Sequence, residues 1–225
     1  MTTNELVTDE MRAYLDKVLE ANKTTNLTRI TSLEEAELLH LEDSLVGLPE
    51  VQSAPDGLLG DLGSGGGFPG VPLALATGRE TLLVDSVKKK MALVQSIIDE
   101  MGLQGRIDTS SERIEDLVKT HSGRFSVLTA RALSRLVSLL ELSAPLLRKG
   151  GRLVCYKAQV GDDELEEARA IETLVGMKLV SQREVLLSDE ETKRTILVFE
   201  KVASPKLKLP RRVGMAQKQP LKPRS

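Results

Sequence analysis

The chain has 225 residues, of which 40% are hydrophobic and 28% are charged. This is enough apolar material for one sizeable core, so we expect one main domain with appendages. The formal net charge of -2 is unevenly spread, because residues 201–225 contain eight Lys and Arg and no Asp or Glu. The acidic body excludes a general polyanion-binding protein, whereas the basic tail favours contact with a polyanion.

The single cysteine and the N-terminus indicate the cellular compartment. Cys155 cannot form an internal disulfide, and its apolar neighbours predict a buried strand residue. The N-terminus is acidic and lacks an apolar signal core, and no segment approaches the roughly 20 apolar residues of a membrane span. We therefore expect a cytoplasmic protein that makes no contact with a membrane.

Helix and strand signals follow one another along the chain. Two helical patterns come first, the second opened by Ser32 with Glu35 three residues later in a capping-box arrangement. In chain order, the predicted elements are helices at 4–20 and 32–46, a loop at 47–57, a strand at 58–61, a helix from 69, a strand at 81–84, a helix at 87–101, a strand at 106–109, a helix at 111–120, a strand at 125–130, a helix at 133–147, a strand at 151–156, a helix from 162, and strands at 178–187 and 192–201. Alternating strands and helices predict an α/β fold with a mostly parallel seven-stranded sheet. The last two strands flank a charged turn and predict an antiparallel hairpin.

The stretch LLGDLGSGGGFPGVPLALATG, residues 58–78, contains the most informative motif. A glycine turn between a strand and a helix brings backbone amides close to a ligand with no Cβ atoms in the way. Gly65, Gly67 and Gly70 fit the spacing of a dinucleotide site, but that spacing alone is weak evidence. The carboxylate of Asp61 would repel a pyrophosphate and attract the ammonium group of S-adenosylmethionine, so charge favours the latter cofactor. The alternative is that Asp61 caps the turn through its backbone.

Three other acidic or titratable residues carry weaker signals. Asp85 follows the second strand, where a carboxylate accepts hydrogen bonds from a ribose, but dinucleotide enzymes use an acid there too. His40 and Asp43 are three residues apart on the second helix and so share a face. Their spacing alone favours a pair of polar residues at the surface.

Several runs of this sequence together resemble the RsmG (GidB) family. They are DLGSGGGFPGVPLALA, LLVDSVKKKMALVQSIIDEMGL, TARALSRLVSLLELSAPLLRKGGRLVCYKAQ, NLTRI from Asn26, HLEDS from His40 and PRRVGMAQKQPL from Pro210. The resemblance spans nearly the whole chain in the right order. This bacterial family methylates N7 of a guanine in the decoding-region (530) loop of 16S ribosomal RNA. The resemblance implies a Rossmann-like class I methyltransferase with S-adenosylmethionine as cofactor.

The resemblance also implies site residues and domains. Cofactor-binding residues would be Asp61, Gly63, Ser64, Gly65, Gly67, Phe68, Asp85, Ile114, Glu115 and Arg131. Arg131 matches an arginine at the edge of the family's active site, where it would position a reacting group. The expected domains are an N-terminal helical extension at 1–50, a cofactor-binding methyltransferase domain at 51–203 and a basic tail at 204–225. No metal site is expected.

Basic residues in four places are candidates for RNA contact. They are Lys88, Lys89, Lys90, Lys157, Arg211, Arg212 and Lys218. The three consecutive lysines stand in the first turn of a helix, where the helix dipole disfavours each cation by roughly a few tenths of a kcal/mol. A nearby polyanion would offset that cost, whereas the alternative is a solvated lysine cluster. The tail is predicted to be a flexible or substrate-ordered arm.

Three other functions remain open from the residues themselves. A small-molecule methyltransferase would share the glycine turn but gives no role to the basic tail. A dinucleotide-dependent oxidoreductase must explain Asp61, and a non-catalytic RNA-binding protein must explain a complete cofactor turn. For the favoured enzyme we expect a monomer that acts on 16S ribosomal RNA or the small ribosomal subunit.

Overall fold

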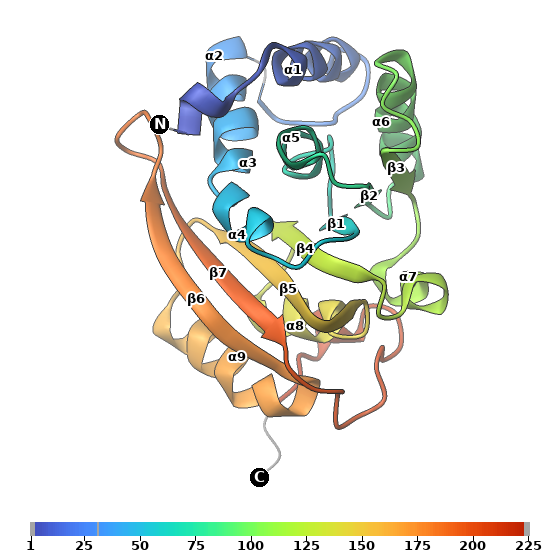
Figure 1. Ribbon diagram of the computed structural model, residues 1–225, viewed down its shortest axis with the longest axis vertical. Coiled ribbons are helices and arrows are strands. Elements are labelled where there is room, and N and C mark those ends of the chain that lie inside the picture. The colour runs from blue at the N-terminus through green and yellow to red at the C-terminus, as the bar shows by residue number, and fades with distance from the viewer. Residues whose placement is uncertain (1–2, 31, 223–225) are drawn as a thin grey trace.

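One seven-stranded sheet forms the centre of the computed structural model, which describes residues 3–30 and 32–222 (Figure 1). The strand order is β3-β2-β1-β4-β5-β7-β6. Strands β1 to β5 run parallel to one another, and β7 runs antiparallel to both β5 and β6. The strands are β1 Leu59–Leu62, β2 Thr81–Val84, β3 Ile107–Ser110, β4 Phe125–Arg131, β5 Leu147–Lys157, β6 Met177–Leu186 and β7 Lys193–Lys201. The predicted α/β class, the seven strands and the closing hairpin are confirmed.

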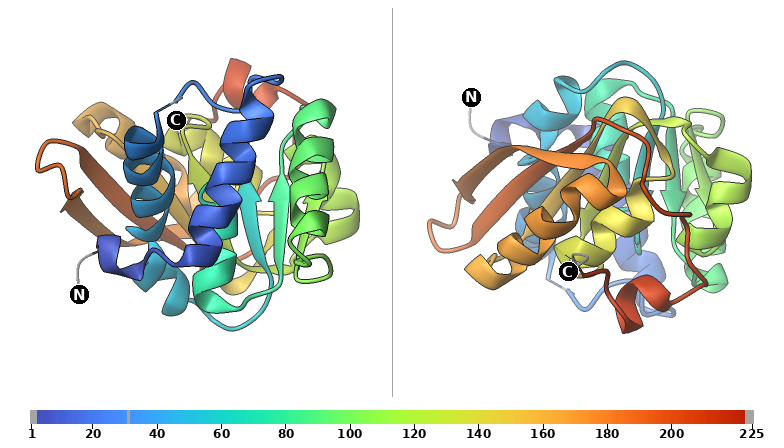
Figure 2. Two further views of the ribbon diagram at one scale, coloured as in Figure 1. Left: turned by 90° about the horizontal axis from the view of Figure 1, so that it is seen from above. Right: turned by 90° about the horizontal axis from the view of Figure 1, so that it is seen from below.

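Helices cover both faces of the sheet (Figures 1 and 2). They are α1 Asp9–Asn22, α2 Leu33–Ala36, α3 Asp43–Leu45, α4 Leu48–Gln52, α5 Gly70–Thr77, α6 Lys88–Glu100, α7 Ile114–His121, α8 Leu136–Ser143, α9 Asp162–Val175 and α10 Met215–Lys218, with shorter-pitch and wider turns at η1 Thr3–Leu6 and η2 Glu37–Glu42. The apolar side chains form two clusters. One joins α1, α3, α5 and α6 to the sheet, and the other joins α7, α8 and α9 to its opposite face.

The N-terminal helices differ in detail from the prediction. The first α-helix begins at Asp9 rather than at residue 4, because the Thr8 side chain accepts a hydrogen bond from the Met11 amide and caps it. Ser32 caps the second helical segment as predicted, by accepting from the Glu35 amide. That segment is not a uniform α-helix, since its middle portion, η2, is a π-helix.

Three other boundaries were predicted wrongly. The expected loop at 47–57 contains helix α4. The helix expected at 133–147 spans only α8, because Pro145 interrupts it and β5 begins two residues later. Helix α7 begins at Ile114 rather than at residue 111, and the preceding residue has the extended backbone of an N-cap. These differences leave the order of the elements unchanged.

The N-terminal helices share a core with the sheet. Met11, Tyr14, Leu15 and Val18 of α1 are fully buried and belong to the same apolar cluster as Leu59 of β1. Because of this shared core, the structure does not separate the N-terminal extension expected at 1–50 from the domain expected at 51–203, and the division near residue 50 stays a prediction. The ends of the expected domains at residues 1 and 225 lie outside the described residues. Within the described ranges, no helix has the length and apolar character needed to cross a bilayer.

Candidate functional site

The glycine turn lies between β1 and α5, at the carboxyl edge of the parallel strands (Figure 2). Its glycines serve two different purposes. Gly65 has a φ of +58°, and a Cβ atom there would meet nothing within 4 Å, so its backbone borders open space. Gly67 has a φ of +88°, and a Cβ there would overlap the Tyr14 hydroxyl. The first glycine leaves room for a ligand, and the second leaves room for helix α1.

Asp61 holds this turn from beneath rather than facing a ligand. Its side chain is fully buried. One carboxylate oxygen accepts from the Gly70 amide at 3.0 Å, and the other accepts from the Thr129 hydroxyl at 2.8 Å. Burial raises the pKa of Asp61, and these hydrogen bonds, the Ser64 hydroxyl and the charge of Arg131 oppose that rise. The geometry favours the capping alternative over direct attraction of a cofactor ammonium group.

Asp85 connects the glycine turn to the start of α6. Its carboxylate accepts from the Gly65 amide at 3.1 Å and from the Val87 amide at 2.9 Å. The side chain remains partly exposed at the carboxyl end of β2. It can therefore accept further hydrogen bonds from hydroxyl groups of a ligand.

A pocket of about 90 Å³ opens beside Asp85. Four residues that the sequence assigned to a cofactor meet in its wall, namely Gly63, Asp85, Ile114 and Glu115. The other lining residues are Val84, Ser86, Glu112, Arg113, Leu133, Leu142, Gly214 and Gln217. Carboxylates beside apolar walls fit a nucleoside, whose hydroxyl and amino groups need acceptors and whose base needs an apolar surface. The expected cofactor residues Asp61, Ser64, Gly65, Gly67, Phe68 and Arg131 are not among the lining residues.

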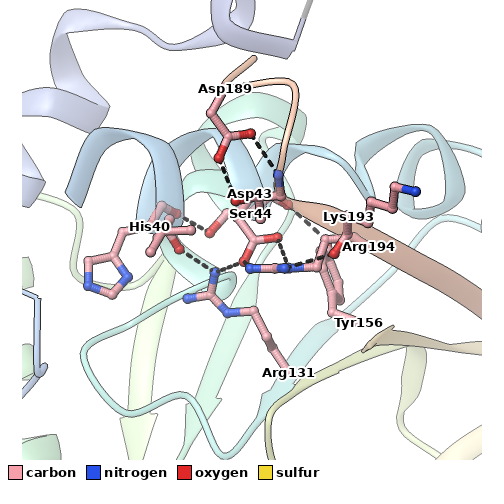
Figure 3. Close-up of polar contacts among 10 residues, drawn as sticks. His40, Asp43, Ser44, Arg131, Tyr156, Asp189, Lys193 and Arg194 are labelled. Carbon is pink, nitrogen blue, oxygen red and sulfur yellow. Dashed lines mark hydrogen bonds and ion pairs between the residues drawn. The ribbon is translucent and has the colours of Figure 1, made fainter. Parts of the chain in front are cut away.

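Arg131 lies at the end of β4 and joins the sheet to the N-terminal helices (Figure 3). Its Nη1 atom donates to the Leu39 carbonyl at 2.9 Å and to the Asp43 carboxylate at 2.8 Å. The other Asp43 oxygen accepts from Nε of Arg194 on β7, also at 2.8 Å. Only 3% of the Asp43 side chain is exposed. The expectation of a surface residue was wrong, because Asp43 is the anion shared by two arginines.

His40 is buried as well, and it contacts the glycine turn. Its ring stacks on Phe68, with centroids 4.6 Å apart and an interplanar angle of 8°. Its Nε2 atom lies 2.8 Å from the Thr28 hydroxyl. Burial, with a smaller effect of Arg131, lowers the pKa of His40 to about 4, so the ring is neutral at pH 7. The predicted surface pair is thus replaced by two buried residues with separate partners.

Two of the basic residues assigned to RNA are only partly exposed and are paired with carboxylates. Lys157 forms an ion pair with Glu164 at 2.7 Å and donates to the Ser134 carbonyl at 2.8 Å. Arg211 forms an ion pair with buried Glu141 at 2.6 Å. Because their charges are already paired within the protein, contact of these two residues with RNA stays a prediction. By contrast, Lys88, Lys89, Arg212 and Lys218 are exposed, with no ion pair to any residue that the structure describes.

A polar groove of about 630 Å³ separates the loop after α1 from helix α6. It is lined by Asn22, Asn26, Leu27, Thr28, Arg29 and Lys90. Arg29 is exposed and, like Lys90, has no ion pair within 3–30 and 32–222. Sequence reasoning did not assign Arg29, although it stands in the NLTRI run. It also missed Gly214 and Gln217, because the tail was predicted to be flexible.

The chain matches one family model and many curated proteins. The model, described as rRNA small subunit methyltransferase G, matches residues 7–195. A protein of that name from Lactobacillus johnsonii is 34% identical, covering 97% of this chain and 93% of its own length. Another from Desulfitobacterium hafniense is 35% identical, covering 95% of this chain and 89% of its own length.

Solved structures share the fold at low sequence identity. The [4+2]-cyclase SpnF has a TM-score of 0.59 and 16% identity, covering 90% of this chain and 97% of its own. A geranyl diphosphate methyltransferase has a TM-score of 0.57 and 16% identity, covering 76% of this chain and 89% of its own. These likenesses support the Rossmann-like arrangement of the sheet and helices.

Replacing Asp61 by Asn tests whether its carboxylate holds the turn. A neutral amide weakens both contacts, because its oxygen carries no charge to accept from the Gly70 amide and its nitrogen cannot accept from the Thr129 hydroxyl, which must then reorient. We expect Asp61→Asn to lower the free energy of unfolding in urea by about 1–3 kcal/mol. Asp108→Asn, at an exposed position of β3, is the matched control and should change it by less than about 0.5 kcal/mol. Equal stability of the two variants would contradict the capping role.

The neutral His40 predicts a pH dependence of stability. Unfolded His40 binds a proton near pH 6.5, whereas folded His40 binds one only near pH 4. The unfolded state therefore holds more protons in this window, and stability falls as the pH is lowered through it, by up to about 3 kcal/mol. In urea unfolding at pH 7 and pH 4.5, His40→Gln should lose less stability than the wild type. Equal losses would show that His40 does not resist protonation.

Proposed function

The chain belongs to the rRNA small subunit methyltransferase G family, and from this premise we propose that it methylates N7 of one guanine in the decoding-region loop of 16S ribosomal RNA. The methyl donor is S-adenosylmethionine. The observation that carries this proposal is the pocket in which Gly63, Asp85, Ile114 and Glu115 meet beside the glycine turn. It lies at the carboxyl edge of the parallel strands, where such sheets bind ligands.

The pocket residues can be given separate roles toward the cofactor. Asp85 would accept hydrogen bonds from the ribose hydroxyls, and the apolar side chain of Ile114 would lie along the adenine. The backbone of Gly63 and Gly65 would lie beside the amino-acid end, since Gly65 borders open space. Asp61 acts one step further away, by fixing the turn through Gly70.

The proposed reaction requires the protein to position the guanine, and it requires no general base. When bound, the cofactor supplies an electrophilic methyl group on a positively charged sulfur. Guanine N7 has a free lone pair and no proton to remove, so the chain needs only to hold the base in line. Oriented approach at about 3–3.5 Å can supply roughly 7–11 kcal/mol of the barrier. The neutral, buried His40 then serves to pack against Phe68.

Arg131 is proposed as a positioning residue. Its Nη1 atom is fixed by Leu39 and Asp43, which sets the orientation of the whole guanidinium. Its other nitrogen atoms donate to no residue in the part of the chain that the structure describes. They can donate to a phosphate, to guanine O6 or to the cofactor carboxylate.

The groove between the loop after α1 and α6 is the proposed place for the RNA backbone. Arg29 and Lys90 line it, and Lys88 and Lys89 stand on the same first turn of α6. Unpaired cations are needed there because the first 200 residues are acidic overall and would otherwise repel RNA. A monomer in the cytoplasm, acting on the RNA or the small subunit, completes the proposal.

Methyl transfer from labelled S-adenosylmethionine tests the reaction directly. The substrates are small-subunit particles and free RNA from cells that lack this protein, and the modified base is mapped by cleavage at N7-methylguanine. We expect one labelled guanine in the decoding-region loop. Binding of the cofactor without transfer to any RNA would contradict the proposed substrate.

The salt dependence of RNA binding tests the groove. The double change Arg29→Ala and Lys90→Ala should weaken binding and reduce the slope of log K against log salt by about 0.7 for each phosphate that the protein no longer neutralises. Lys178→Ala, an exposed lysine at the start of the edge strand β6, is the matched control. An unchanged slope in the double variant would mean that RNA does not enter the groove.

A further inference from the structure

The chain beyond β7 folds back onto the body instead of forming a free arm. Arg211 makes a two-pronged ion pair with Glu141 of α8, from Nε to Oε1 at 2.7 Å and from Nη2 to Oε2 at 2.6 Å. Only 2% of the Glu141 side chain is exposed. Leu209 and Leu221 pack against the apolar cluster on the same face of the sheet. Residues 209–222, which we name the C-terminal strap, are thus anchored near both ends.

The middle of the C-terminal strap is also fixed. The buried Ser138 hydroxyl donates to the carbonyl of Ala216 at 2.7 Å, and Ala216 is itself 2% exposed. The Gly214 amide donates to Oε1 of Glu115 at 2.7 Å. Because Glu115 belongs to α7 and lines the pocket, this bond joins the strap directly to the candidate cofactor site.

Two strap residues, Gly214 and Gln217, form part of the pocket wall together with Asp85 and Ile114. The pocket is partly open to solvent, so a ligand need not fit wholly within its volume of about 90 Å³. Asp85 follows β2 and Ile114 begins α7, so the docked strap completes a wall that the sheet and α7 leave open.

We propose that the docked C-terminal strap is a wall of the cofactor pocket and that Gln217 contacts the bound cofactor. This inference rests on the proposed function, which assigns the pocket to S-adenosylmethionine. The Gln217 side chain is exposed and offers both a donor and an acceptor to a nucleoside. Cofactor binding and strap docking are then coupled, and each favours the other by the same factor. The proposed role of this part of the tail is therefore contact with the cofactor rather than with RNA.

Cofactor affinity without RNA provides the first test. We would measure binding of S-adenosylhomocysteine by calorimetry to the full-length wild type, Gln217→Ala and Gln219→Ala. Both glutamines are exposed, so neither change should affect folding. Gln217→Ala should bind roughly 2- to 10-fold more weakly, the loss expected for one hydrogen bond. Gln219→Ala, whose side chain is outside the pocket wall, should bind like the wild type.

Proteolysis provides the second test. Arg212 and Lys218 are exposed trypsin sites within the C-terminal strap, and the C-terminal fragments can be followed by mass spectrometry. Saturating S-adenosylhomocysteine should slow cleavage at these two sites more than at exposed Lys178. Wild-type protein that binds no cofactor would overturn the proposed function itself. If the wild type binds the cofactor but Gln217→Ala binds it with equal affinity, the proposed role of the strap is overturned and the proposed function stands. The same holds if the cofactor binds but does not slow cleavage at Arg212 and Lys218.

Discussion

Two hydrogen bonds to the carboxylate of Asp61, from the Gly70 amide and the Thr129 hydroxyl, determine where the glycine turn lies. A turn built from glycine has almost no side chains with which to pack, so its position must be fixed by groups from other elements. Asp61 fixes the turn from beneath, and the Tyr14 hydroxyl fixes it from the side by donating a hydrogen bond to the Gly66 carbonyl at 2.9 Å. The open space beside Gly65 exists because these buried groups hold the rest of the turn in place.

The N-terminal helices are part of the same arrangement. Asp43 accepts from both Arg131 and Arg194, and so ties η2 and α3 to the ends of two strands (Figure 3). Removing one partner from a buried ion pair is far more costly than the pair is stabilising, so all three charges depend on one another. With the helix fixed there, His40 comes to lie flat against Phe68. The candidate site is therefore supported by residues more than 80 positions apart in sequence.

The sequence predicted what depends on local pattern, and failed where distant parts of the chain meet. Alternating strands, the hairpin and the glycine turn follow from apolar spacing and turn residues, and they were predicted correctly. The burial of Asp43 could not be predicted, because both of its arginine partners lie far along the chain. The same holds for Arg211, which composition alone assigns to a solvated basic tail. Its partner Glu141 lies within an apolar helix, and an acid buried there was the only available signal.

The paired and unpaired cations determine where the proposed site could attract RNA. Arg211 of the basic tail forms an ion pair with Glu141, so part of the charge of the tail is neutralised within the protein. In Figure 2, helix α10 of the tail and the end of α1 both lie at the edge toward which the parallel strands point. Figure 1 shows that they are nevertheless far apart across that edge, with α1 at the top and the tail below. The C-terminal strap thus flanks the candidate pocket, whereas the groove with Arg29 and Lys90 lies between the loop after α1 and helix α6. If the pocket holds S-adenosylmethionine as proposed, RNA that approaches it would meet unpaired charge both from Arg29 and Lys90 in the groove and from Arg212 and Lys218 on the strap.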